Sequence, residues 1–222
     1  MLCANIMTLQ DICQKVAGTH IASVWESLLG LYDQLDRNCQ NFQNAFNVHC
    51  PSGCGTCCEH FIPELTEAEA SLIAAYILFV KKTPELIDLL ASVDEPGSQC
   101  PLYRADSDYH CIVYPARALV CRLFGACPSE DKYRKPVFRK CKYNVAMDTP
   151  IFVKAEDITL SNLDIATMNT YGLKPEMITS VSDTEPLPLA VVKAAQRLLF
   201  LMVYLDDGSN MPEPDTPAPI AS

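Results

Sequence analysis

The chain has 222 residues, of which 49% are apolar, so it can bury a hydrophobic core and is not a disordered protein. Only 20% of the residues are charged, and the net charge of −10 argues against a general nucleic-acid binder. The unusual feature is the 12 Cys, nine of which lie between Cys50 and Cys141.

The amino terminus predicts a cytoplasmic protein. Residues 1–10 have neither a basic region nor an apolar run long enough for a signal peptide. In a reducing compartment thiols do not pair as disulfides and stay free to bind metal. We therefore expect metal chemistry from the cysteines.

Most predicted elements are helices. Apolar residues recur at spacings of three and four over 21–46, which predicts an amphipathic helix. A capping-box pattern predicts a helix that begins at Thr66, and a short helix is expected from Pro84 to the Pro96-Gly97 breaker. Further helices are predicted over 161–169 and 188–205. Lys193 and Arg197 interrupt the second of these, which therefore reads as a buried or partner-facing helix and not as a membrane span.

Residues 100–141 show no sustained apolar period, so short strands or loops are expected there. The predicted fold class is mainly α, a single domain with an irregular, metal-organised cysteine-rich segment. The expected divisions are an N-terminal helical cap (1–48), a cysteine-cluster metal-binding region (49–142), a C-terminal helical region (143–207) and a disordered Pro-rich tail (208–222).

The first group of candidate ligands is a short loop. Cys50, Cys54, Cys57 and Cys58 are spaced C-x3-C-x2-C-C, and Gly53 and Gly55 let such a loop turn several thiolates inward. The side chains of neighbours such as Cys57 and Cys58 are expected to diverge. Either one of them is not a direct ligand, or the site holds more than one metal.

Four downstream cysteines complete the predicted ligand set, namely Cys100, Cys111, Cys121 and Cys127. Cys141 is left open as a further ligand or a bystander. His49, His60 and His110 lie near cysteines in sequence but are left out of the set, and Cys3, Cys13 and Cys39 are expected to be buried apolar residues.

Thiolate-rich sites suit zinc, iron–sulfur clusters and copper(I) alike. Three Cys-Pro steps favour an iron–sulfur cluster, of the 4Fe–4S type. The stretch 117–142 has a charge of +6 in a chain whose remainder is −16, so it could stabilise an anionic cluster, dock an acidic partner or form a solvated face. Arg117 and Arg122 flank Cys121 and are candidate cofactor-binding residues that act behind the ligands, through hydrogen bonds to sulfur or to a carboxylate.

These motifs resemble a known family. The C-x3-C-x2-C-C loop is followed by Leu-Thr-Glu-Ala-Glu at 65–69, Cys-Pro-Leu at 100–102, Cys-Ile-Val-Tyr-Pro-Ala-Arg at 111–117 and Cys-Arg-Leu-Phe-Gly at 121–125. This order is similar to that of the cysteine-cluster family of zinc- or iron-chelating domains, over about 50–127. A related domain of flagellin lysine N-methylase implies an iron–sulfur cluster. Family members commonly have Arg-Pro before the Cys-Arg element, whereas Ala118 follows Arg117 here.

The sequence thus predicts a metal-binding protein whose iron–sulfur cluster serves electron transfer or supports a partner enzyme. One alternative is a structural zinc-binding interaction module. Another is a cluster-dependent enzyme, either methylase-like or like the radical S-adenosylmethionine enzymes. Against the latter, Thr56 stands where an aromatic residue is usual, and no alternating strand and helix pattern is present. A protein partner is expected, with no nucleic acid and no membrane.

Overall fold

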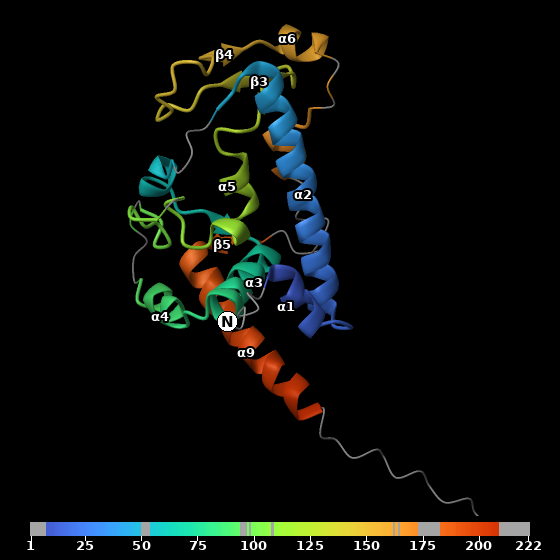
Figure 1. Cartoon of the computed structure of the whole chain (residues 1–222), viewed down its shortest axis with the longest axis vertical. Helices are drawn as coiled ribbons and strands as arrows, with labels where there is room; N and C mark the ends of the chain where they lie inside the picture. Colours follow the sequence, from blue (N-terminus) through green and yellow to red (C-terminus); the bar gives the residue numbers. More distant parts are fainter. Residues whose placement is uncertain are drawn as a thin grey trace, which may run out of the picture.

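A computed structural model describes residues 8–49, 54–93, 97, 99–107, 109–161, 163, 165–172 and 183–208, without the side chains of 172 and 204–208. The chain forms a mostly helical single body that is elongated along one axis (Figure 1). This agrees with the predicted fold class. The predicted tail beyond Gly208 lies outside the described residues.

Two helices form the amino-terminal part, α1 (Leu9–Lys15) and α2 (His20–Phe46). The side chain of Thr19 caps α2, and Asn47 ends it in the left-handed conformation with φ 52°. The buried face includes Trp25, Leu28 and Leu35, at the spacings that predicted this helix. The prediction over 21–46 is confirmed.

The lower half of the body in Figure 1 packs three helices together, α3 (Glu67–Ala75), α4 (Glu85–Ala91) and α9 (Leu187–Gly208). The helix α3 continues as a π-helical turn, η2 (Tyr76–Lys81). The Thr66 cap of α3 is confirmed, as are the helices expected after Pro84 and over 188–205. Two short antiparallel strands, β1 (Glu64–Leu65) and β5 (Glu185–Pro186), tie the start of α3 to the start of α9.

We use the name cysteine-rich segment for the stretches 54–59 and 100–127, which lie on either side of α3 and α4. These stretches contain only short helical elements, namely η1 (Thr56–Glu59), η3 (Tyr114–Ala116) and α5 (Leu119–Leu123). Loops join them, as expected for a segment without apolar periodicity. The helix α5 packs on α2, and in Figure 1 it lies between α2 and the loops that carry the other cysteines.

A small sheet and one helix form the end of the molecule at the top of Figure 1. We call residues 129–160 the strand lobe. Its elements are β2 (Ser129–Glu130), β3 (Pro136–Arg139), β4 (Phe152–Val153) and α6 (Ala155–Leu160), with β3 paired antiparallel to both other strands. A second, smaller core forms beneath it, where the rings of Phe42 and Phe138 lie 5.5 Å apart.

The helix predicted over 161–169 is wrong. The helix α6 ends at Leu160, where the backbone N–H and hydroxyl of Ser161 bond back to its last turn, and α7 begins only at Met168 (Met168–Gly172). Contacts with distant residues hold the backbone between them, because the N–H of Ala166 donates to Asn38 Oδ1 and that of Met168 to the carbonyl of Pro128. Tertiary hydrogen bonds outweigh local helix propensity in this stretch.

None of the helices described here is long and apolar enough to cross a membrane, α9 included.

Candidate metal centre

The loop that carries three of the candidate ligands begins at Cys54. A 3-10 turn over η1 brings the N–H of Cys58 to the carbonyl of Gly55 at 2.8 Å. The loop lies so close to the segment behind it that a Cβ on Gly55 would be 2.3 Å from Cβ of His110 and 2.8 Å from Cε2 of Tyr103. Only glycine fits at this close approach.

The segment behind this loop is a tight hairpin-like turn from Cys100 to Cys111. An antiparallel bridge pairs Tyr103 with Cys111, which sets the two cysteines near each other. The N–H of Cys100 donates to the carbonyl of Cys58 at 2.7 Å, and the hydroxyl of Tyr103 donates to Glu59 Oε1 at 2.7 Å. Two hydrogen bonds therefore fasten this turn to the first loop.

The helix α5 presents Cys121 from the opposite side, and a buried carboxylate positions this helix. Glu69 Oε1 accepts the N–H of Leu119 at 2.8 Å, at the first residue of α5. Glu69 Oε2 accepts from the N–H and hydroxyl of Thr66 at 3.1 and 2.9 Å. Glu69 is thus an N-cap partner for two helices, α3 and α5, that are distant in sequence.

These three pieces enclose one cavity of about 70 Å³, which we call the thiol cavity. Six cysteines line it, namely Cys54, Cys57, Cys58, Cys100, Cys111 and Cys121. Most of the remaining lining is apolar or aromatic, including Phe61, Ile73 and Phe124, and Arg117 is the one charged residue among the described lining residues. Apart from Arg117 and the tyrosines Tyr109 and Tyr114, the described lining side chains that carry a heteroatom are all cysteines.

Burial raises the pKa of several of these thiols. The pKa of Cys100 rises to about 11, and those of Cys111 and Cys121 also lie above the ordinary value of 9.0, chiefly because burial disfavours the thiolate. The other thiols add to the effect at Cys121, since each thiolate would repel the next. Arg117 opposes the rise at Cys111. Ionising all six thiols in this space requires a cation among them.

The side chains of the adjacent residues Cys57 and Cys58 lie closer together than the sequence predicted. The Sγ atoms of Cys57 and Cys58 lie 4.0 Å apart, so the expectation that these side chains diverge is wrong. Two sulfurs bound to one tetrahedral metal at about 2.3 Å would be separated by about 3.8 Å. Their hydrogen bond lowers the pKa of Cys57 to about 6 and raises that of Cys58. The pair can therefore provide one thiolate even without metal.

The donor set fits a thiophilic metal, because sulfur ligands select zinc, copper(I) and iron–sulfur clusters. Within the described ranges, no three Cys, His, Asp or Glu side chains converge closely enough to hold one ion. The thiols thus surround a shared space without forming a closed coordination polyhedron. Of the sulfur–sulfur distances, that of 4.0 Å between Cys57 and Cys58 is close to the value for two ligands of one metal.

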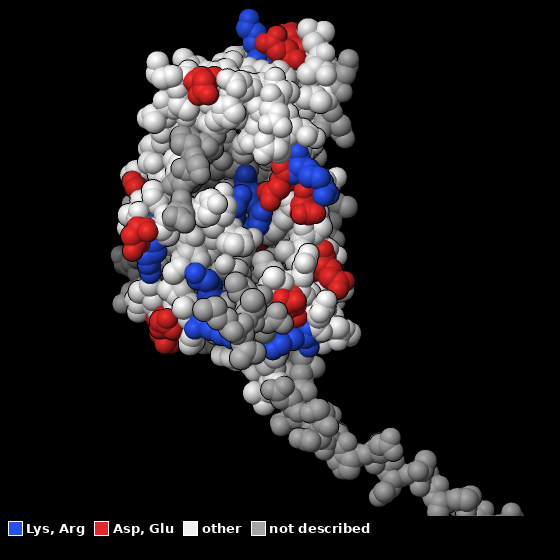
Figure 2. All heavy atoms as spheres, in the orientation of Figure 1, with Lys and Arg blue, Asp and Glu red and all other residues white. Residues whose placement is uncertain are grey.

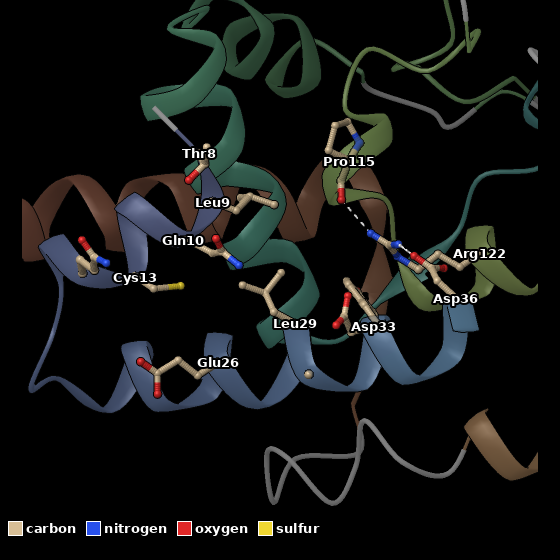
Figure 3. A pocket seen from close by; sticks show the side chains of 13 residues that line it. Thr8, Leu9, Gln10, Cys13, Glu26, Leu29, Asp33, Asp36, Pro115 and Arg122 are labelled. Carbon is tan, nitrogen blue, oxygen red and sulfur yellow. Dashed lines mark hydrogen bonds and ion pairs between the residues drawn. The ribbon is translucent and has the colours of Figure 1, made fainter. Parts of the chain in front are cut away.

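The two arginines predicted to support the ligands lie on opposite sides of the Tyr114–Leu123 segment. Arg117 lines the thiol cavity, and its guanidinium lies 3.9 Å from the centre of the Tyr114 ring. Arg122 points away from the cavity. It pairs with Asp36 at 2.7 Å and donates to the carbonyl of Pro115 at 2.7 Å, at one end of a larger hollow between α1 and α2 (Figure 3). Arg122 therefore fastens α5 to α2 rather than facing sulfur.

The remaining sequence candidates lie elsewhere. Cys127 is outside the thiol cavity, where its thiol donates to the carbonyl of Ala166 at 3.4 Å and lies beside Cys39, and Cys141 is in the strand lobe. Cys50 lies outside the described residues and stays a predicted ligand. None of the three histidines is among the described lining residues: His49 contacts Asn47, His60 stacks on Tyr143, and His110 packs against Tyr103.

The basic run 117–142 does not surround the cavity either. Most of its cations belong to the strand lobe, and Arg117 alone of them is a described lining residue. The sequence also did not reveal that Glu69 holds α5, because its capping pattern carries no information about a partner 50 residues away. Both features depend on tertiary contacts.

Comparison with known proteins agrees with this geometry. Residues 49–143 match the family model CxxCxxCC, described as "Putative zinc- or iron-chelating domain". No curated protein and no solved structure matches the chain significantly. The matched stretch contains the whole C-x3-C-x2-C-C loop and all six cysteines of the thiol cavity. Residues 49–143, which are less than half of the chain, are therefore similar to the cysteine domains that this family model describes.

Proposed function

We propose that the protein holds an iron–sulfur cluster in the thiol cavity and serves electron transfer or supports a partner enzyme. The observation that carries the proposal is the convergence of six cysteines from three separate pieces of chain on one apolar space. A buried structural core has no need of six thiols that would repel one another as thiolates. A metal centre does need them, because each thiolate is then neutralised by ligation.

Iron is favoured over zinc by the setting of the donors. Their number does not decide between the metals: six thiols line the cavity, which exceeds the four ligands of one zinc ion, but a single iron–sulfur cluster also takes four and a pair of zinc ions takes more. The apolar lining would exclude water from the sulfurs, and Arg117 would offset part of their negative charge. When bound, an iron–sulfur cluster supplies one-electron chemistry, which such an environment tunes.

The chain's own residues have distinct tasks in this proposal. Glu69 holds the helix of Cys121, and the Tyr103–Glu59 hydrogen bond holds the turn of Cys100 and Cys111 against the first loop. Phe61 and Phe124, whose ring centres lie 5.2 Å apart, line the cavity and are each 37% exposed, so they separate the sulfurs from solvent. An electron donor or acceptor would approach over these rings.

The test is metal and sulfide analysis of anaerobically purified protein, together with Mössbauer spectroscopy. We expect a brown protein with iron and acid-labile sulfide in comparable amounts. A colourless protein with stoichiometric zinc and no sulfide would replace the cluster with a structural zinc module, since zinc has a filled d shell. A Cys13→Ser variant is the control, because Cys13 is a buried residue of α1 outside the thiol cavity.

A further inference from the structure

The most exposed large apolar side chains of the described residues lie in the strand lobe. Its five most exposed large apolar side chains are Met147 at 98%, Val145 at 83%, Ile151 at 81%, Leu160 at 78% and Tyr133 at 70%. No large apolar side chain elsewhere among the described residues exceeds 65%. An apolar concentration of this kind indicates an interaction surface.

The loop that presents Val145 and Met147 is firmly held. Buried Asn144 donates to the carbonyl of His49 at 2.6 Å, and the ammonium of Lys140 donates to the carbonyl of Ala146, between the two exposed residues. On the loop's far side, the N–H of Lys140 donates to the carbonyl of Ile151 at 2.9 Å. The apolar side chains therefore project from a fixed frame, and their exposure does not come from a loose loop.

Cations alternate with these apolar side chains. The guanidinium of Arg139 lies 5.5 Å from the ring centre of Phe152, its partner across the sheet, and Lys142 lies 4.6 Å from that of Tyr143. The stretch 132–154 has seven Lys and Arg residues against Asp148 alone. Glu156 and Asp157 of α6 are the other exposed carboxylates of the lobe. Asp131 accepts two backbone N–H groups of its own turn, and Glu130 accepts from Thr167.

We propose that the strand lobe attaches the protein peripherally to an anionic lipid surface. The most exposed of these side chains are aliphatic and lie in a stretch with seven Lys and Arg residues, a combination of apolar anchors and positive charge that suits the headgroup region of an anionic bilayer. Each nearby Lys or Arg adds attraction to an anionic bilayer. On the face drawn in Figure 2, most atoms at this end of the molecule belong to uncharged residues.

The acidic remainder of the chain does not oppose this contact. The strand lobe forms one end of the long axis (Figure 1), so a bilayer bound there lies far from the carboxylates of the opposite end, whose charge is screened by salt. The inference departs from the expectation that no membrane is involved. It does not depend on which metal the thiol cavity holds.

The test is co-sedimentation of the full chain with vesicles. One set is phosphatidylcholine alone, and the other is an equimolar mixture of phosphatidylcholine and phosphatidylglycerol. We expect binding to the anionic vesicles, little binding to the neutral ones, and weaker binding at high salt. A double variant, Met147→Ser with Ile151→Ser, should bind at least tenfold more weakly. Lys142→Gln with Lys154→Gln should weaken binding and reduce its salt dependence.

The matched control is Leu199→Ser with Val203→Ser, which changes exposed apolar residues of α9 outside the lobe and should leave vesicle binding unchanged. Thermal unfolding of each variant confirms that the fold is intact. Equal binding by wild type and the Met147/Ile151 variant would overturn the proposal, as would the absence of binding to anionic vesicles. Salt-sensitive binding to soluble polyglutamate without vesicle binding would also overturn it, and would assign the lobe to an acidic protein partner.

Discussion

Helix α2 and the cysteine-rich segment acquire their order in different ways. The apolar residues of α2 repeat along 27 residues and bury Trp25, Leu28 and Leu35 completely. In the stretches 54–59 and 100–127 the longest helix, α5, has five residues. Residues such as Leu119 join the main core, and the order of the segment also depends on single polar contacts such as Glu69 with Leu119 and on a close backbone approach at Gly55. A segment built in this way can hold its thiols in fixed positions without an extensive core of its own.

The largest expected effect is a loss of bound metal. It should occur when a cysteine that lines the thiol cavity is replaced, and not when a cysteine outside the cavity is replaced. Cys121→Ser should lower the metal content of anaerobically purified protein at least tenfold, because a cavity ligand is lost. Cys127→Ser should retain wild-type metal, since Cys127 lies beside Cys39. Elemental analysis of both proteins is the measurement. Equal metal loss in the two variants would show that the cavity does not define the ligand set.

The second prediction tests the link between the helices and the cysteine-rich segment. Glu69→Gln should lower the free energy of unfolding by about 3 kcal/mol. Both carboxylate oxygens now accept hydrogen bonds, from Thr66 and from Leu119, and the amide NH2 group that replaces one oxygen cannot accept. Urea denaturation provides the value. Glu67→Gln on the same helix is the control: its pair with Arg197 is exposed, and the change should stay within about 0.5 kcal/mol. Similar losses in both variants would refute the special role of Glu69.

The third prediction concerns the thiols without metal. Because folding raises the pKa of Cys100 from 9.0 to about 11, the unfolded chain loses this proton at lower pH than the folded protein does. The contribution of Cys100 to the free energy of unfolding is fully present below about pH 9. It falls by about 2–3 kcal/mol as the pH rises to about 11. Denaturation of metal-free protein across this pH range measures it. Cys100→Ser should flatten the slope, and an unchanged slope would contradict the assignment.

The smallest expected effect is the change in the free energy of unfolding when either of two glycines is replaced by alanine. Gly55→Ala should cost about 2 kcal/mol, since the new methyl group would overlap His110 and Tyr103. Gly30→Ala, in the middle of α2 with nothing within 4 Å of the added Cβ, should stabilise the protein by about 0.5–1 kcal/mol. Thermal or urea unfolding gives both values. If Gly55→Ala is also stabilising, the first loop does not press against the turn behind it.

Periodic and local features were predictable from sequence, whereas contacts between distant segments were not. The spacing of apolar residues predicted α2, and the Thr66–Glu69 pattern predicted the start of α3. Motif spacing identified candidate ligands, but it could not separate Cys121, which lines the cavity, from Cys127, which does not. That distinction depends on how α5 packs against α2, which is a tertiary contact.

The arginines illustrate the same limit. Arg117 lies four residues before Cys121 and Arg122 directly follows it, yet Arg117 lines the thiol cavity while Arg122 pairs with Asp36 on α2. Arg117 precedes α5 and has an extended backbone with ψ 146°, so the helical period of α5 does not set its direction relative to Arg122. Sequence proximity could not assign the two roles.

The most direct test of the central claim is X-ray absorption spectroscopy at the metal edge of anaerobically purified protein. If the cysteines of the thiol cavity hold the metal, the first coordination shell consists of sulfur at about 2.3 Å, and it loses sulfur or metal when Cys121 is replaced by serine. A first shell of nitrogen and oxygen, or a folded protein with less than about a tenth of an equivalent of metal, would contradict the account.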